Sequence, residues 1–460
     1  VSFLHQCRKQ RNLIHAKFLQ SYLQRHGLVS HKSIGNLIVS LLVDVGCLSD
    51  AQTAFDMLVS KNEFAWNSIV SGHAKYGEFE YAFIMYKKMR EVSVPTSPHT
   101  FVALLKDCAK KKDLQQGSAL HADILERRIL YGKTSPYVGS ALISMYAKCG
   151  ALAKAQEVLE TLPVRNVVSW NALIAGYVQH GWDHKALDCY ELMQFEGLTP
   201  NAITFTCILK VCGSTRDVKS GSEIHNEILT RGLLEKDIAL GTTLVDMYAK
   251  CGALEKAQMV LEGLHARNVV SWSALIAGYA QHGQGHEALV CFEHMQNEGL
   301  SANAVTFLCA LKACACIGAI EKGEQVHAEI ISRGFLKNDV VLGNALLDMY
   351  TKCGDLVKAA QVLDDFPFRN IVSWNTLIGG YVQQDKGHEA LNCYERMQRE
   401  GLYPDITTFI CVLKACGKVR ALENGKHIHK KIVRKGLLEK NIDLGTALVD
   451  MYVKCGDLTK

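Results

Sequence analysis

The amino-acid sequence repeats itself with a period of 102 residues, and this periodicity restricts the possible folds more than any other feature. The period is marked by two residue types: Trp170, Trp272 and Trp374, and Cys149, Cys251, Cys353 and Cys455. Each period divides into three shorter repeats of 35, 36 and 31 residues, as in 167–201, 202–237 and 238–268. A repeat of this size is typical of a helical solenoid, in which one repeat cannot bury its apolar face without its neighbours.

The repeat 167–201 has the pattern of a helical hairpin. NALIAGYVQHG, from Asn171, carries apolar residues at helical spacing, and HKALDCYELMQFEG, from His184, carries a second such run. Gly181 separates the runs, and Pro200 closes the repeat because proline cannot continue a helix and disfavours helix in the residue before it. We therefore predict an all-α fold, a superhelical solenoid of stacked helical hairpins.

The same register divides the chain into fourteen repeats. The expected boundaries are 1–31, 32–62, 63–97, 98–135, 136–166, 167–201, 202–237, 238–268, 269–303, 304–339, 340–370, 371–405, 406–441 and 442–460. The repeat 98–135 has two extra residues, around Tyr131 and Gly132. We expect one continuous solenoid over 1–460. The first and last repeats are incomplete and lack a polar capping helix, so we also expect that the chain is truncated at both ends.

Composition permits several partners and excludes some chemistry. The net charge of +5 allows a polyanionic partner without requiring one. No apolar run is long enough to predict a membrane span.

The seventeen cysteines lie in amphipathic helical segments, which favours a reducing compartment over disulfides. No two are spaced as CxxC, and pairs such as Cys207 and Cys212 are five apart, so they diverge on a helix. We expect no metal, no cofactor and no catalytic activity in these residues.

Three sequence segments recur, with small variations, in a fixed order in the repeats of 35, 36 and 31 residues. They are VVSWNALIAGYVQHG, GLTPNAITFTCILKVCG and LVDMYAKCGALEKAQ. In length, order and amino-acid sequence these repeats closely resemble the P, L and S motifs of plant pentatricopeptide repeat proteins, and the resemblance covers essentially the whole chain. Under this scheme the P repeats are 63–97, 167–201, 269–303 and 371–405; the L repeats are 1–31, 98–135, 202–237, 304–339 and 406–441; and the S repeats are 32–62, 136–166, 238–268, 340–370 and 442–460.

The resemblance implies a function and a location. Pentatricopeptide repeat proteins bind single-stranded RNA, and the P-L-S order is similar to the subgroup that directs cytidine-to-uridine editing of organellar transcripts. We expect a monomer in a mitochondrion or chloroplast, with a transcript and other RNA-editing factors as partners; any targeting peptide would precede Val1. Two other interpretations are a protein-binding helical scaffold like the tetratricopeptide repeat, of 34 residues, and the targeting part of a nuclease or deaminase whose catalytic domain is missing.

The resemblance also implies which residues read the RNA, because the fifth and last residues of P and S motifs together face one base. The fifth places hold small polar residues: Asn36, Asn67, Ser140, Asn171, Thr242, Ser273, Asn344, Asn375 and Thr446. The last places hold Asn62, Ser97, Asn166, Asn201, Asn268, Asn303, Asn370 and Asp405. The L repeats instead have Val102, Thr206, Leu308 and Ile410 at the fifth place. The alternative is helix capping, which Asn, Ser and Thr also favour.

Unstacked bases expose edges that side chains can address one at a time. A last-place Asp only accepts hydrogen bonds and suits the imino N–H of uracil or guanine, whereas Asn both donates and accepts. In the family, Ser or Thr at the fifth place accompanies purines and Asn accompanies pyrimidines. The implied target is 5′-Y-C-n-A-Y-n-A-A-n-Y-U-n-R-3′, with adenine opposite Thr242 and Asn268 and uracil opposite Asn375 and Asp405.

Two further places can contribute. The second place is mostly apolar, and family members use it to sandwich bases, with ordinary core packing as the alternative: Phe64, Tyr137, Val168, Ala239, Val270, Val341 and Val372. Lysines recur at the thirteenth place of S repeats, where they can contact phosphates or be solvated: Lys148, Lys250, Lys352 and Lys454.

Overall fold

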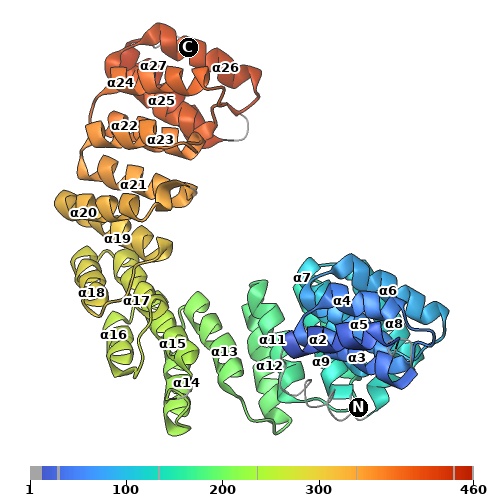
Figure 1. The fold of residues 1–460 in the computed structure, drawn as a ribbon. Helices are drawn as coiled ribbons and strands as arrows, with labels where there is room; N and C mark the ends of the chain where they lie inside the picture. Colours follow the sequence, from blue (N-terminus) through green and yellow to red (C-terminus); the bar gives the residue numbers. More distant parts are fainter. Residues whose placement is uncertain are drawn as a thin grey trace. The chain divides into compact units, whose positions relative to one another are not determined.

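The computed structural model describes residues 13–27, 32–132, 135–235, 237–337, 339–438 and 441–457. Every regular element among these residues is a helix, which confirms the predicted all-α solenoid of helical hairpins (Figure 1). By its internal contacts the chain divides into two compact units, an N-terminal unit of residues 1–211 and a C-terminal unit of residues 212–460. No helix of the described residues is both long and apolar enough to cross a membrane.

The helices of the N-terminal unit follow one another in pairs. They are α2 (Leu13–Arg25), α3 (Lys32–Val45), α4 (Leu48–Asp56), α5 (Glu63–Tyr76), α6 (Phe79–Glu91), α7 (Pro98–Lys111), α8 (Leu114–Glu126), the short 3-10 helix η2 (Ile129–Tyr131), α9 (Ser135–Lys148), α10 (Leu152–Thr161), α11 (Val167–Gln179) and α12 (Asp183–Phe195). Helix α13 (Ala202–Thr215) contains the division between the two units.

The C-terminal unit continues the same pattern. Its helices are α14 (Val218–Thr230), α15 (Ile238–Lys250), α16 (Leu254–Gly263), α17 (Val269–Gln281), α18 (Gly285–Asn297), α19 (Ala304–Ile317), α20 (Ile320–Ser332), the 3-10 helix η3 (Phe335–Lys337), α21 (Val340–Cys353), α22 (Leu356–Asp365), α23 (Ile371–Gln383), α24 (Gly387–Arg399), α25 (Ile406–Val419), α26 (Leu422–Arg434) and α27 (Ile442–Cys455).

The helix starts agree with the repeat register. The first helix of a repeat begins at the first residue of that repeat, as α11 does at Val167 and α15 at Ile238. Helix α9 differs, because it begins at Ser135, one residue before the expected start of its repeat. Gly181 adopts φ of +71° just after α11 ends, which explains why the helical pattern breaks there. The division of the whole chain into fourteen repeats stays a proposal.

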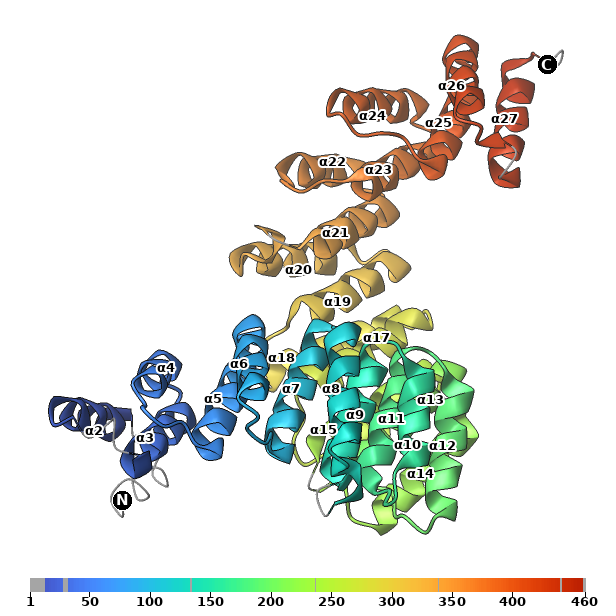
Figure 2. The ribbon, with the colours of Figure 1, turned by 90° about the vertical axis from the view of Figure 1, so that its right-hand side faces the viewer.

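Each unit is built from two kinds of helix contact (Figure 2). The first helices of successive repeats pack against one another. In the N-terminal unit these are α5, α7, α9 and α11, and in the C-terminal unit they are the odd-numbered helices from α15 to α27. Second helices pack on their own first helix and also on the first helix of the next repeat, as α10 does on α9 and α11 and α24 does on α23 and α25. The apolar face of one hairpin is therefore buried by the next.

One cysteine in each of three L repeats is fully buried in this core. Cys212, Cys314 and Cys416 are at most 1% exposed, and burial raises the pKa of each thiol to about 12. These thiols therefore stay protonated at neutral pH and act as small apolar groups. Among the described residues, no group of three or more His, Cys, Asp or Glu side chains could hold a metal ion.

Candidate nucleic-acid interface

The last-place residues of P and S repeats cap the first helix of the following repeat. The side-chain oxygen of each accepts a hydrogen bond from the backbone N–H of the next repeat's third residue: Asn62 from Ala65 (2.9 Å), Ser97 from Thr100 (3.2 Å), Asn166 from Ser169 (2.9 Å), Asn201 from Thr204 (3.1 Å), Asn268 from Ser271 (2.8 Å), Asn303 from Thr306 (2.9 Å), Asn370 from Ser373 (3.1 Å) and Asp405 from Thr408 (2.7 Å). The capping interpretation therefore holds at this place. Capping uses the oxygen, and within the described residues none of the six last-place asparagines donates a hydrogen bond from Nδ2 to the protein.

The structure brings the fifth- and last-place residues together in most of the predicted pairs. Four pairs are joined directly: Asn36 Oδ1 accepts from Asn62 N–H (3.1 Å), Asn67 Oδ1 from Ser97 N–H (2.7 Å), Asn171 Nδ2 donates to Asn201 Oδ1 (3.0 Å), and Asn375 Nδ2 donates to Asp405 Oδ1 (3.1 Å). Two pairs share a hydroxyl: Ser373 bonds Asn344 and Asn370, and Thr306 bonds Ser273 and Asn303. The remaining fifth-place hydroxyls donate to carbonyls of their own helix: Ser140 to Pro136, Thr242 to Ile238, and Thr446 to Ile442.

Burial differs between the two places in some pairs but not in all, since Thr242, Asn268, Asn344 and Asn370 are all partly exposed. Asn36, Asn171 and Ser273 are only 1%, 6% and 5% exposed, whereas Asn62, Asn201 and Asp405 are exposed. A base that approached such a pair would therefore meet the last-place side chain first and reach only an edge of the fifth-place side chain.

The second-place side chains lie on the surface. Phe64, Tyr137, Val168, Ala239, Val270, Val341 and Val372 are all exposed, with Tyr137 at 74%. The alternative that they pack in the core is therefore wrong. Exposed apolar side chains that recur once per repeat are available to contact a flat apolar ligand.

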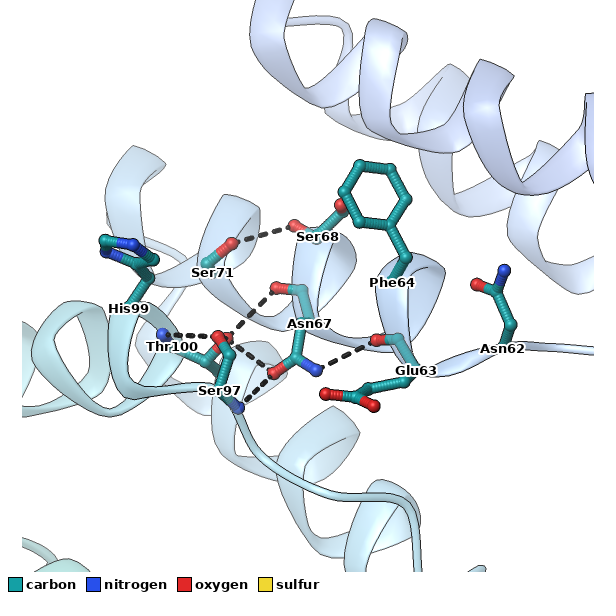
Figure 3. Close-up of a pocket in the computed structure, with 9 residues that line it drawn as sticks. All are labelled: Asn62, Glu63, Phe64, Asn67, Ser68, Ser71, Ser97, His99 and Thr100. Carbon is teal, nitrogen blue, oxygen red and sulfur yellow. Dashed lines mark hydrogen bonds between the residues drawn. The ribbon is translucent and has the colours of Figure 1, made fainter. Parts of the chain in front are cut away.

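Two hollows in the N-terminal unit contain these places together. One is lined by Tyr137, Val168 and two successive predicted pairs, Ser140 with Asn166 and Asn171 with Asn201. The other is lined by Asn62, Phe64, Asn67 and Ser97, and most of its hydrogen bonds involve Asn67 (Figure 3). In each hollow an exposed apolar side chain lies beside the polar groups predicted to read a base.

Asp405 is the only acidic residue among the predicted base-reading side chains. Burial alone would raise the pKa of its carboxyl, but hydrogen bonds from Thr408 and Asn375 outweigh burial and hold the pKa below its usual value. The carboxylate is therefore ionised at neutral pH and offers only acceptors.

The lysines of the S repeats are mostly engaged with acidic neighbours. Lys250, Lys352 and Lys454 lie 2.7, 2.8 and 2.7 Å from Asp246, Asp348 and Asp450, one helical turn earlier, while Lys148 has Ser144 at that place. A phosphate would compete with these aspartates. Exposed ion pairs of this kind contribute little free energy, so the competition is not prohibitive.

A second set of lysines was not predicted from the sequence. Lys106, Lys210, Lys312 and Lys414 occupy the ninth place of the L repeats, one helical turn after the fifth place, and all four are exposed. None of the four forms an ion pair with a described residue. Lys106 lines the same hollow as Tyr137 and Ser140. Their recurrence at almost the same period as the S-repeat lysines was visible in the sequence.

The buried hydroxyls at the third place were not predicted from the sequence either. Thr100, Thr204, Thr306, Thr408, Ser169, Ser271 and Ser373 are at most 1% exposed and lie at the junctions between repeats. The signal was the spacing of Asn, Asp or Ser and a hydroxyl residue three positions later, which is typical of a reciprocal helix cap.

Two family models match several separate segments of the chain. A family model described as PPR repeat family matches residues 61–110, 165–214, 267–316 and 369–418, and one described as PPR repeat matches 140–167, 242–269 and 344–371. The chain is 33% identical over 423 residues to a chloroplastic pentatricopeptide repeat-containing protein of Arabidopsis thaliana, covering 92% of the chain and 67% of that relative.

A mitochondrial pentatricopeptide repeat-containing protein of Arabidopsis thaliana is also 33% identical, over 435 residues, covering 94% of the chain and 42% of that relative. The chain thus spans between 42 and 67% of the length of these two relatives. Among solved structures, the pentatricopeptide repeat protein PPR10 from maize aligns with a TM-score of 0.68 at 18% identity, over 99% of this chain and 71% of that one. The alignment with PPR10 is a likeness of fold.

Proposed function

The chain belongs to the pentatricopeptide repeat family, and from this membership and the geometry of its repeat junctions we propose that it binds single-stranded RNA with sequence specificity. The observation that carries the proposal is the meeting of fifth- and last-place polar side chains in six of the eight complete pairs, together with the exposed apolar side chains at the second place. Such a site has the two parts that recognition of an unstacked base requires, a surface for stacking and hydrogen-bonding groups for its edge.

Each P or S repeat would hold one base. Second-place side chains such as Tyr137 and Val168 would contact the two faces of a base, and the pair between them would contact its edge. The ninth-place lysines of the L repeats and the thirteenth-place lysines of the S repeats would contact the phosphates. These contacts would supply affinity that does not depend on the RNA sequence. The L repeats, with mostly apolar fifth places, would add phosphate contacts and spacing in place of base reading.

We propose in addition that the protein recognises cytidine-to-uridine editing sites in an organelle. The P-L-S order of repeat lengths supports this role, and the two relatives described above are named as chloroplastic and mitochondrial proteins. The expected target is 5′-Y-C-n-A-Y-n-A-A-n-Y-U-n-R-3′.

The proposal is tested by binding the full chain to three RNAs of equal length: a single strand that contains the target, its complement alone, and the duplex of the two. We expect the first to bind most tightly, because a duplex hides the base edges that the pairs would contact. Equal affinity for all three would contradict base reading, and no binding to any of them would favour a protein-binding scaffold.

A further inference from the structure

The hydroxyl residue at the third place lies beneath the base-reading pair of the preceding repeat. Thr204 is 0% exposed, and its Oγ1 accepts a hydrogen bond from the backbone N–H of Asn201 at 3.1 Å. The same Oγ1 lies 2.7 Å from Oδ1 of Asn171, which is 33 residues earlier in the chain. A side chain this deeply buried cannot touch RNA, so any effect on recognition must act through Asn171 and Asn201.

The Thr204 hydroxyl fixes the orientation of the Asn171 amide. A hydroxyl has one hydrogen to donate. Oδ1 of Asn171 is the nearer acceptor, at 2.7 Å against 3.1 Å for Oδ1 of Asn201. With its oxygen held by Thr204, Asn171 directs Nδ2 to Oδ1 of Asn201 at 3.0 Å. Oδ1 of Asn201 also accepts from the backbone N–H groups of Ile203 and Thr204, both at 3.1 Å.

Both amide oxygens of the pair are thus used inside the protein. The pair therefore offers mainly N–H groups outwards, one from Asn171 and two from Asn201, beside one remaining lone pair on Oδ1 of Asn171. A base edge with acceptors complements this arrangement, whereas an edge that presents a donor at the same point does not. The hydroxyl therefore determines which side of the Asn171 amide faces the solvent.

A donor to the fifth-place amide oxygen recurs in other repeats, although Nδ2 has different acceptors: Asn375 donates to Asp405, whereas Asn67 donates to the carbonyls of Glu63 and Pro95. Thr100 and Thr408 lie 2.7 Å from Oδ1 of Asn67 and Asn375, and Ser373 lies 2.5 Å from Oδ1 of Asn344. At the Asn36 pair the third place holds Ala65, and Oδ1 of Asn36 accepts from the backbone N–H of Asn62 instead. Each of these fifth-place amide oxygens is therefore held by a donor from the following junction.

We propose that the buried third-place hydroxyl is a positioning residue for base recognition, which orients the fifth-place asparagine of the preceding repeat. The proposal rests on the proposed RNA-binding function. It adds a residue that does not touch RNA to the pair expected to read each base, and it makes the specificity of one repeat depend on the next repeat in the chain.

The test compares three variants of the full chain. Thr204→Val keeps the shape of the side chain and removes the hydroxyl, so the Asn171 amide can rotate and turn its oxygen outwards. Thr204→Ser keeps the hydroxyl. Thr206→Val is the matched control, because it removes a hydroxyl two residues away in α13 that donates to the carbonyl of Ala202 at 2.8 Å. Helical content by circular dichroism confirms that each variant is folded.

The readout is the ratio of affinities for two RNAs that differ only in a pyrimidine or a purine at the nucleotide opposite Asn171. A ratio measured on one protein sample does not depend on the fraction that is folded. We expect Thr204→Val to lower the preference for the pyrimidine about fivefold, the factor that corresponds to one neutral hydrogen bond. Thr204→Ser and Thr206→Val should keep the ratio of the unmodified protein.

The two proposals fail in different ways. An unmodified protein that prefers the pyrimidine, together with a Thr204→Val variant that prefers it equally, would overturn the positioning role and leave RNA reading intact. If Thr206→Val lowered the preference for the pyrimidine by the same factor, the positioning role would also be overturned, because a general loss of packing would then explain both variants. An unmodified protein without any preference would overturn the proposed function and the positioning role together.

Discussion

At the scale of single residues, each last-place side chain has two tasks in the proposed interface. Asn268 caps α17 through its oxygen, which accepts from the backbone N–H of Ser271 at 2.8 Å, while Ser271 returns a hydrogen bond to the backbone of Asn268. A residue at the last place must therefore cap the following helix as well as contact a base. Asn, Asp and Ser are all favourable caps, so the choice among them remains open for specificity.

This freedom predicts that base preference can be changed without loss of the fold. In the double variant Thr242→Asn and Asn268→Asp, the new pair repeats the one formed by Asn375 and Asp405. Asp remains a good cap, and its charge is favourable at a helix N-terminus. Ser271 would take the place of Thr408 in holding the new amide. We expect the preferred base at this nucleotide to change from adenine to uracil, because a carboxylate accepts from the imino N–H of uracil.

By analogy with base-edge contacts in DNA, the change in preference should be roughly tenfold to a hundredfold. The measurement is a competition between RNAs that carry adenine or uracil at this one nucleotide. RNAs altered opposite Ser273 and Asn303 serve as the control, because that pair is unchanged. A folded double variant that still prefers adenine would show that Thr242 and Asn268 do not read this base.

At the scale of helices, the stack depends on close contacts that only glycine permits. A Cβ added to Gly278 in α17 would lie 2.6 Å from Cβ of Ala249 in α15 and 3.2 Å from its Cα. A Cβ added to Gly221 in α14 would instead meet the side chain of Met247, 2.6 Å from its Sδ. The first contact is with atoms fixed to the backbone, and the second is with the end of a flexible side chain.

The two glycines should therefore differ in their tolerance of alanine. We expect Gly278→Ala to destabilise the stack by about 1 to 3 kcal/mol, as overpacking does, and Gly221→Ala to cost less because Met247 can change its rotamer. Gly445→Ala is the control, since a Cβ there meets nothing within 4 Å and alanine favours the helix. Hydrogen exchange of the α15 and α17 amides measures the effect locally, which suits a stack stabilised by neighbouring contacts. Equal protection in Gly278→Ala and Gly221→Ala would contradict the argument.

At the scale of the whole molecule, what the sequence could predict depended on how far apart the interacting residues lie in the chain. The repeat period placed helix starts such as Val167 and Ile238, because local signals mark each hairpin. The pairing of Lys250 with Asp246 also follows a local rule, since residues four apart on a helix are neighbours. The contact of Thr204 with Asn171 joins two repeats and depends on how the hairpins stack, which no local pattern specifies.

The two sets of lysines would contribute to the electrostatic attraction between the whole molecule and RNA. Changing Lys106, Lys210, Lys312 and Lys414 to Gln should weaken binding to matched and unmatched RNA alike. Four lost phosphate contacts should reduce the slope of log affinity against log salt by about 3, since each contact to a single strand contributes roughly 0.7. The preference for the matched RNA should not change, because phosphates carry no sequence information.

The matched control changes the S-repeat lysines Lys148, Lys250, Lys352 and Lys454 to Gln. Both variants lose four positive charges from a net charge of +5, so a difference between their salt slopes reports the placement of the charges and not their number. We expect the smaller reduction in this control, because aspartates already hold three of its lysines and a phosphate must displace them. A larger reduction in the control than in the L-repeat variant would assign the phosphate contacts to the S repeats, and an unchanged slope in both would leave the lysines as solvated surface.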